Sequence, residues 1–163
     1  RRQRQMCIRD RYSLYPQSLN QWFRDNIAQD FPEIRTQISG LLQIEAELQE
    51  IVQLVGSDAL PVDQQLTLEV ARMIREFFLQ QNGFHDVDAY CDIHLQYSMS
   101  KAILSFQEAA KSAMAAGAQL NDVVNVPART TLMRGRFEKG YIDTIDDMVK
   151  SMIDEIADTV EDN

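Results

Sequence analysis

The stretch that decides the fold runs from Leu41 to Phe84, LLQIEAELQEIVQLVGSDALPVDQQLTLEVARMIREFFLQQNGF. Apolar residues recur in it at spacings of three, four and seven, which indicates two amphipathic helices. Gly56 stands where a glycine in the left-handed conformation would end the first helix, and Asp63 is placed to cap the second. We therefore predict two helices joined by a short turn and followed by an aromatic-rich segment.

Helical periodicity continues on both sides of this pair. The first helix should begin near Ile34, because Asp30 followed by Pro32 is a helix start signal. A third helix is predicted over about 87–116, then a short turn at 120–124 and a segment that starts at Pro127. A last helix carries a stripe close to a heptad pattern at Ile142, Ile145, Val149, Met152, Ile156 and Val160. Since no alternating apolar run is long enough for a convincing strand, the predicted fold is all-α, an antiparallel helical bundle with short loops.

The chain divides into three segments on these patterns. Residues 1–11, RRQRQMCIRDR, have no helical or strand period, and we interpret them as a foreign or disordered leader rather than as a basic arm that binds membrane. Residues 12–135 form the predicted helical domain, with short helical pieces over its aromatic first part, 12–31. Residues 136–163 form an acidic C-terminal helix and tail, whose apolar stripe we expect to be core or to dock a neighbouring helix.

Composition excludes several classes of protein. The 163 residues suffice for one domain with a real core, and no apolar run approaches the roughly 20 residues that span a bilayer. The net charge is -9; the first eleven residues carry five arginines and one aspartate, or +4, which leaves -13 for the rest. We expect no nucleic acid partner, because phosphate binding needs a positive field. Two cysteines, Cys7 and Cys91, make no disulfide framework and favour a reducing compartment.

No motif for catalysis is present in the sequence. It lacks G-x-x-x-x-G-K-[ST], G-x-S-x-G and H-E-x-x-H. His85, Cys91 and His94 could be read as metal ligands, but a closed zinc site needs four, so a buried thiol and two surface or loop histidines are the simpler interpretation. Carboxylate pairs such as Glu45 with Glu47 fit a solvated acidic face. We predict no catalytic and no metal-binding residues.

Three phenylalanines near the end of the decisive stretch allow two interpretations. Phe77 fits the apolar stripe and should be core. Phe78 lies one step off the stripe, and Phe84 follows a glycine in a loop. These two rings could close the end of the bundle, or they could line a site for a flat ligand such as a nucleotide base, which stacks on phenyl faces.

The chain resembles the C-terminal helical domain of the catalytic A (alpha) subunit of V/A-type rotary ATPases and ATP synthases, over roughly residues 12–135. The resemblance is densest in Leu41–Gly56, Asp58–Pro61, Leu66–His85 and Val87–Cys91. The β subunit of F-type ATP synthases is similar more distantly. The resemblance implies a rotary motor that couples ATP synthesis or hydrolysis to proton or sodium transport. In such a motor the catalytic subunit has, besides this domain, an N-terminal barrel and a P-loop nucleotide domain.

The resemblance also implies particular sites and partners. Phe84 and Phe78 match positions on the adenine side of the ATP pocket; the full subunit would bind ATP or ADP with Mg, and no cofactor is expected for the isolated chain. The partners would be the central-stalk rotor subunits and neighbouring B subunits, in the cytoplasm on the inner face of the cell membrane, with membrane contact only indirect. The positions matching the rotor-facing loop are Gly56, Ser57, Asp58, Ala59, Leu60, Pro61, Val62 and Asp63.

This turn has fewer acids than the F-type loop and contains Pro61, so steric contact is a better expectation than an electrostatic push. We expect its tip to present Asp58, Leu60, Pro61 and Asp63. Two other hypotheses remain open at the level of sequence. One is a free-standing helical module that binds a partner helix and no nucleotide. The other is a metal-dependent hydrolase that uses His85 and His94.

Overall fold

The computed structural model describes residues 16–80, 92–135 and 140–161, and these residues form helices and no strand. The all-α prediction is therefore confirmed. In chain order the elements are α2 (Pro16–Asn26), α3 (Phe31–Val55), the 3-10 helix η1 (Ser57–Ala59), α4 (Val62–Met73), the π-helix η2 (Ile74–Leu79), α5 (Ile93–Ala115), α6 (Leu120–Val124), α7 (Pro127–Gly135) and α8 (Tyr141–Glu161).

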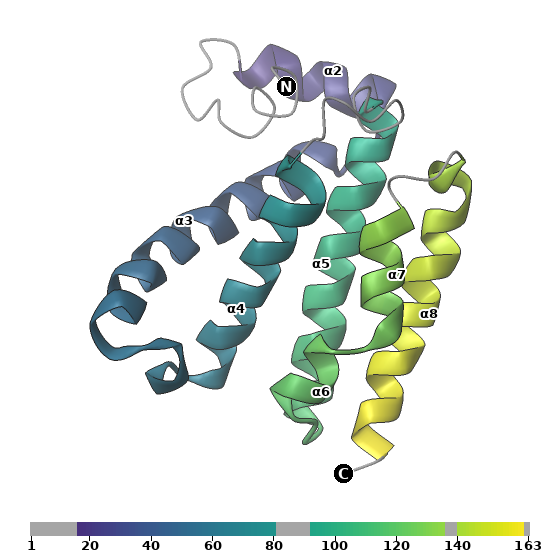
Figure 1. The fold of residues 1–163 in the computed structure, drawn as a ribbon. Helices are drawn as coiled ribbons and strands as arrows, with labels where there is room; N and C mark the ends of the chain where they lie inside the picture. The colour runs from purple at the N-terminus through teal and green to yellow at the C-terminus, as the bar shows by residue number, and fades with distance from the viewer. Residues whose placement is uncertain (1–15, 81–91, 136–139, 162–163) are drawn as a thin grey trace.

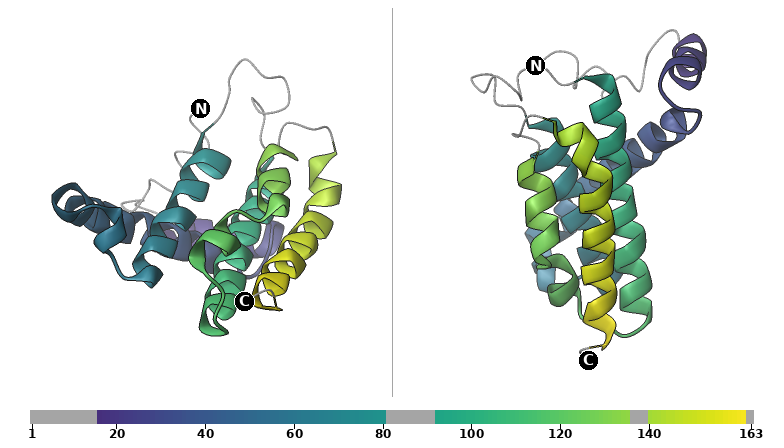
Figure 2. Two further views of the ribbon diagram at one scale, coloured as in Figure 1. Left: turned by 60° about the horizontal axis from the view of Figure 1, so that its bottom comes forward. Right: turned by 90° about the vertical axis from the view of Figure 1, so that its right-hand side faces the viewer.

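The helices form two groups that share one core. The α3 and α4 helices are an antiparallel pair that projects to one side, and α5, α7 and α8 stand side by side (Figures 1 and 2). The α4 and η2 helices pack against α5, which joins the two groups, and α2 lies across the start of α3. The largest fully buried side chains come from both groups and include Ile38, Leu66, Met73, Phe77, Phe106, Leu132, Ile145 and Met152.

The start of α3 is fixed by aromatic packing around Asp30. Pro32 lies in the first turn, where a missing N–H costs nothing, as the start signal predicted. The carboxylate of Asp30 makes no side-chain cap; it accepts a hydrogen bond from the Tyr97 hydroxyl of α5, at 3.0 Å to Oδ1 and 3.3 Å to Oδ2. The ring of Phe31 contacts those of Phe23 and Tyr97 edge to face, with centroids 5.2 and 5.6 Å away. This aromatic contact attaches α2 and α3 to α5.

The α7 and α8 helices are held together by Tyr141. Its hydroxyl donates a hydrogen bond of 2.7 Å to the carbonyl of Leu132, and its side chain is only 3% exposed. The ring lies against Gly135, the last residue of α7. Gly135 thus serves the close approach of two helices.

Most of the apolar stripe of α8 is part of the core, as expected, whereas Ile142 at its start is 41% exposed. Ile145, Met152 and Ile156 are 0–1% exposed and α8 packs on α5 and α7. Glu155 on the same helix accepts a hydrogen bond of 2.7 Å from the backbone N–H of Ala128. The division of the chain at 11 and 135 stays a prediction. None of the helices in the described ranges has the length and apolar character needed to cross a membrane.

Candidate functional site

The turn between α3 and α4 begins at a glycine with an unusual backbone. Gly56 has φ 87° and ψ 158°, a region that essentially only glycine adopts. Its N–H bonds the carbonyl of Val52 at 2.9 Å and closes the last turn of α3. Gly56 therefore ends the helix as predicted, but its ψ is extended and not that of the left-handed helical conformation.

The start of α4 differs from the prediction. Pro61, not Asp63, is the N-cap, and its carbonyl accepts the N–H groups of Gln64 and Gln65 at 2.9 and 3.0 Å. Asp63 lies inside the first turn, where the positive end of the helix dipole favours a carboxylate. The prediction of an Asp63 cap was wrong because Pro61 supplies the first helical carbonyl, so the helix already includes Asp63.

The predicted rotor-facing residues, Gly56 to Asp63, comprise the connection between α3 and α4 and the first two residues of α4, and all of them except Leu60 are exposed. Leu60 is 6% exposed, which corrects the expectation that its side chain is presented at the tip. Its carbonyl also accepts a hydrogen bond of 2.8 Å from Gln65 Nε2, so Leu60 anchors the turn to α4. Asp58 is exposed and accepts a hydrogen bond of 3.1 Å from the Ser57 hydroxyl.

Apolar side chains beside the turn are exposed as well. We call Ile51, Leu54, Val55 and Val62 the apolar tip; their exposed fractions are 44%, 86%, 59% and 50%. They lie at the end of α3 and the start of α4, on both sides of the turn. A group of exposed apolar residues at one end of a folded domain is typical of an interaction surface.

The α3–α4 pair is joined near its other end by an ion pair. Glu45 on α3 is 5% exposed, and its Oε1 lies 2.7 Å from Arg75 Nη2 on η2 and accepts a hydrogen bond from Gln49 at 3.3 Å. The sequence interpretation of Glu45 as part of a solvated acidic face was wrong, because the helix turns this carboxylate toward η2. The pair restrains α3 against the following element.

The π-helix explains where the two adjacent phenylalanines lie. The N–H of Gln80 bonds the carbonyl of Arg75, five residues earlier, at 2.8 Å. In the widened turns both Phe77 and Phe78 are buried, at 0% and 2% exposure. Phe78 therefore belongs to the core, although an α-helical pattern placed it off the stripe. Phe84, the other predicted base-stacking residue, lies outside the described residues.

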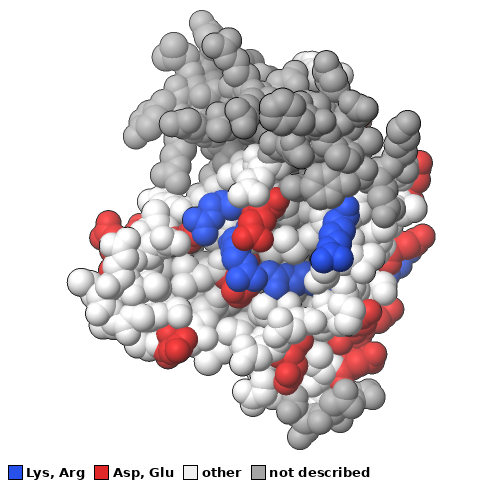
Figure 3. Space-filling model, in the orientation of Figure 1, with Lys and Arg blue, Asp and Glu red and all other residues white. Residues whose placement is uncertain are grey.

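A basic hollow that the sequence analysis missed lies among α4, η2, α6 and α7. It has a volume of about 510 Å³, and its lining includes Arg72, Glu76, Arg129 and Arg134. Figure 3 shows basic side chains gathered around a hollow in the middle of this face. The sequence signal was weak, because these residues belong to separate helices and only the fold brings them together.

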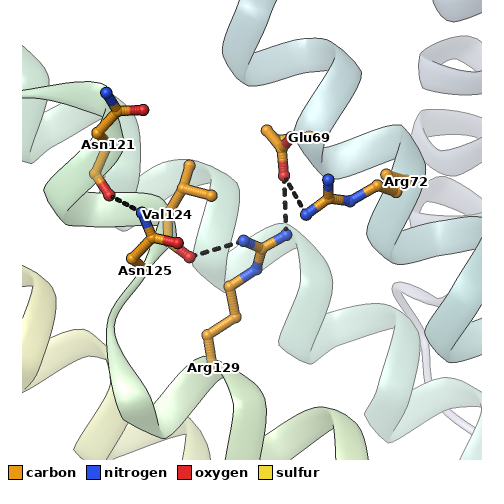
Figure 4. Close-up of polar contacts among 6 residues, drawn as sticks. All are labelled: Glu69, Arg72, Asn121, Val124, Asn125 and Arg129. Carbon is orange, nitrogen blue, oxygen red and sulfur yellow. Dashed lines mark hydrogen bonds and ion pairs between the residues drawn. The ribbon is translucent and has the colours of Figure 1, made fainter.

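Arg129 lies at the centre of the polar contacts beside this hollow (Figure 4). It is 5% exposed, and its Nη1 donates to the carbonyl of Val124 at 2.7 Å. Its Nη2 lies 3.1 Å from Glu69 Oε2, which also pairs with Arg72 at 3.0 Å. The Arg129 Cζ stands 5.1 Å from the centre of the Phe106 ring. Burial lowers the pKa of Arg129, and the nearby Glu69 carboxylate opposes that shift.

The possible metal ligands are not gathered in the part of the chain that the structure describes. His94 is exposed on α5, whereas His85 and Cys91 lie outside the described residues. In the described ranges no three histidine, cysteine or acidic side chains form a group that could hold a metal ion.

Comparison with known proteins gives one consistent relationship. Residues 20–124 match the family described as the C-terminal domain of V and A type ATP synthase. The chain is 46% identical over 146 residues to the A subunit of the A-type ATP synthase from Methanosarcina barkeri, a match that covers 90% of the chain and 25% of that protein. It is 43% identical over 151 residues to the V-type ATP synthase alpha chain 1 of Clostridium tetani, covering 91% of the chain and 25% of the relative. The chain thus spans about a quarter of the length of the curated relatives it matches.

Proposed function

This chain belongs to the family of C-terminal domains of V and A type ATP synthases, and we propose that it is the part of the catalytic subunit that contacts the central rotor. In this role it serves a rotary ATPase that couples ATP synthesis or hydrolysis to ion transport. The partners are the central-stalk rotor subunits and neighbouring B subunits. The domain works in the cytoplasm, peripheral on the inner face of the cell membrane.

The observation that carries the proposal is the apolar tip. Leu54, Val55 and Val62 are at least half exposed beside the turn to which we assign the rotor contact. Burial of such side chains against a partner stabilises the contact by about 25 cal/mol for each Å² removed from water. The exposed acids of the turn are Asp58 and Asp63, too few for a purely electrostatic push. Contact through apolar side chains and shape is therefore the better mechanism.

The α3–α4 pair is suited to transmit a displacement between its tip and the core. Ion pairing of Glu45 with Arg75 and burial of Ile38, Leu41 and Leu66 restrain the two helices at their base. A rigid pair moves as one body when the domain swings, and this rigidity couples nucleotide-dependent closure to the rotor.

We further propose that Phe84 stacks on the adenine of bound ATP or ADP in the full subunit, where Mg accompanies the phosphates. Phe78 supports this wall from the core, since its side chain is 2% exposed. Stacking of a base on an aromatic ring is worth about 1–3 kcal/mol. The sequence has no P-loop, so the isolated chain should bind ATP weakly or not at all. A free-standing interaction module without nucleotide gains no support from the relatives.

The rotor assignment is tested in the complete ATPase with the turn altered. Pro61→Gly should leave the bundle folded because the turn lies at one end of it. Deletion of 58–62 also removes the buried Leu60 and should lower stability somewhat while the rest of the bundle stays folded. Ion pumping per ATP hydrolysed, and torque in single-molecule rotation, should fall more than ATP affinity does. Leu54→Ser should act in the same direction through the apolar tip.

The matched control is Ile142→Ser, which changes an apolar residue on α8 that is 41% exposed and far along the chain from the turn. It should leave coupling intact. Unchanged coupling in both the turn deletion and Leu54→Ser would overturn the rotor assignment.

A further inference from the structure

We propose that the basic hollow among α4, η2, α6 and α7 is a binding site for a phosphate group. The site is separate from the rotor-facing turn, because Arg72 lies in the last turn of α4 and the turn precedes its first. If no phosphate binds in this hollow, the proposed rotor contact is unaffected. The ligand is either free phosphate or the phosphate of a small organic monoester.

The first support is a local excess of positive charge. Three arginines, Arg72, Arg129 and Arg134, line the hollow in a protein whose net charge is -9. Two carboxylates lie close, since Glu76 also lines the hollow and Glu69 pairs with Arg72 and Arg129. The small positive balance suits an anion of low charge and disfavours a polyanion such as nucleic acid.

The second support is that donors remain available. No ion pair engages Arg134 within the described ranges, and its side chain is exposed at the rim. Arg129 is 5% exposed, yet its Nε has no hydrogen-bond partner. Buried donors are nearly always satisfied, so an orphaned guanidinium nitrogen beside a hollow calls for an acceptor. A small shift of the Arg129 guanidinium group toward a bound ligand would give its Nε a hydrogen-bond acceptor.

The geometry favours phosphate over a lone carboxylate. Guanidinium groups reach the hollow from α4 and from two positions on α7, and Thr130 adds a hydroxyl to the lining. A tetrahedral oxyanion offers several oxygens in different directions, whereas a carboxylate offers two in one plane. Arginine forks match phosphate oxygens with paired, charge-assisted hydrogen bonds. Bound phosphate would join α4 to α7 and stabilise the bundle.

The test is calorimetric titration of inorganic phosphate into the whole chain near neutral pH, with ionic strength held constant by sodium chloride. We expect saturable binding at one site in the millimolar range, with NMR shifts at the amides of Thr130, Met133 and Arg134. Arg134→Gln should weaken binding about tenfold, equivalent to about 1.4 kcal/mol. Because Arg134 is exposed, this variant should fold normally, and Arg72→Gln provides a second test of the site.

Lys111→Gln is the matched control, because it removes one positive charge from an exposed position on α5. It should bind phosphate as the unaltered chain does. Titration with phenyl phosphate distinguishes the two candidate ligands. If phenyl phosphate binds as tightly as inorganic phosphate, the ligand is a phosphate monoester; if it binds more weakly, the ligand is free phosphate. No saturable binding, or equal losses in Arg134→Gln and Lys111→Gln, would overturn the proposal.

Discussion

The contact between Gly135 and Tyr141 shows how much depends on a single missing methyl group. A Cβ at Gly135 would lie 2.4 Å from Tyr141 Cε2 and 2.7 Å from Cδ2. The ring cannot move away freely, because it is 3% exposed and its hydroxyl is bonded to Leu132. The helix pair α7–α8 therefore requires glycine here for space.

Gly135→Ala should lower the free energy of unfolding by about 1–3 kcal/mol, the usual cost of overpacking. Urea denaturation measures the change. Gly40→Ala is the control: Gly40 lies within α3 and a Cβ there meets nothing within 4 Å, so the substitution should stabilise by about 0.5–1 kcal/mol. Equal effects of the two substitutions would contradict the packing argument.

Residue roles in the turn were only partly predictable. Gly56 was identified as a helix terminator, because few other residues tolerate positive φ. The burial of Leu60 and the N-cap at Pro61 were not predicted. Both depend on the path of the chain after η1 and on the hydrogen bond from the Gln65 side chain to the Leu60 carbonyl. Such local hydrogen bonds leave no periodic signal in sequence.

At the scale of elements, the bond from Tyr97 to Asp30 ties α5 to the start of α3. Burial raises the pKa of Tyr97, and the hydrogen bond to Asp30 and the charge of that carboxylate raise it further. A raised pKa means that the neutral phenol is favoured in the folded state. Its stabilising effect is complete below the unfolded pKa of about 10 and is lost as pH rises through the folded value.

Tyr97→Phe should therefore be less stable than the unaltered chain at neutral pH, and the difference should shrink above about pH 10. Urea unfolding at a series of alkaline pH values measures it. The remaining tyrosines are common to both chains, so their titration cancels in the comparison. A difference that stays constant across this range would show that Tyr97 does not couple ionisation to folding.

The helices themselves were predicted well, apart from η2. Periodicity placed α3, α4, α7 and α8 close to their observed bounds, because each buries one apolar face. The α5 helix ends where predicted but begins only at Ile93, after the predicted start near residue 87. The π-helix was missed because its sequence, IREFFL, reads as ordinary helix, and the extra residue is accommodated only through packing of Phe77 and Phe78 in the core. The burial of both rings could be predicted only if the π-helix was known.

At the scale of the whole molecule, α8 is part of the bundle although it lies beyond residues 20–124, the family match. Its buried residues meet α5 and α7, as the heptad stripe predicted. The expectation that the resemblance ends near Gly135 was wrong, because a match over 146 of the 163 residues must reach into α8. The basic hollow, by contrast, could not be predicted from the sequence. It depends on the approach of α4 to α6 and α7, which no local pattern encodes.

Met152→Ala should destabilise the entire chain by about 2–5 kcal/mol, since Met152 is 0% exposed and truncation leaves a cavity. Ile153→Ala, one residue along the same helix at 38% exposure, should cost much less. Circular dichroism and tryptophan fluorescence from Trp22 on α2 should report the same transition in both variants. A separate early loss of α8 helicity in Met152→Ala would mean that α8 does not share the cooperative core.

The apolar tip also governs how the isolated chain behaves in concentrated solution. Molecules with a net charge of -9 repel one another over a Debye length of about 10 Å at 0.1 M salt, whereas apolar contacts act only at close range. Added salt screens the repulsion and leaves the attraction between exposed Leu54 and Val55 side chains. Ionic strength thus sets the balance between dispersed molecules and clusters that form end to end.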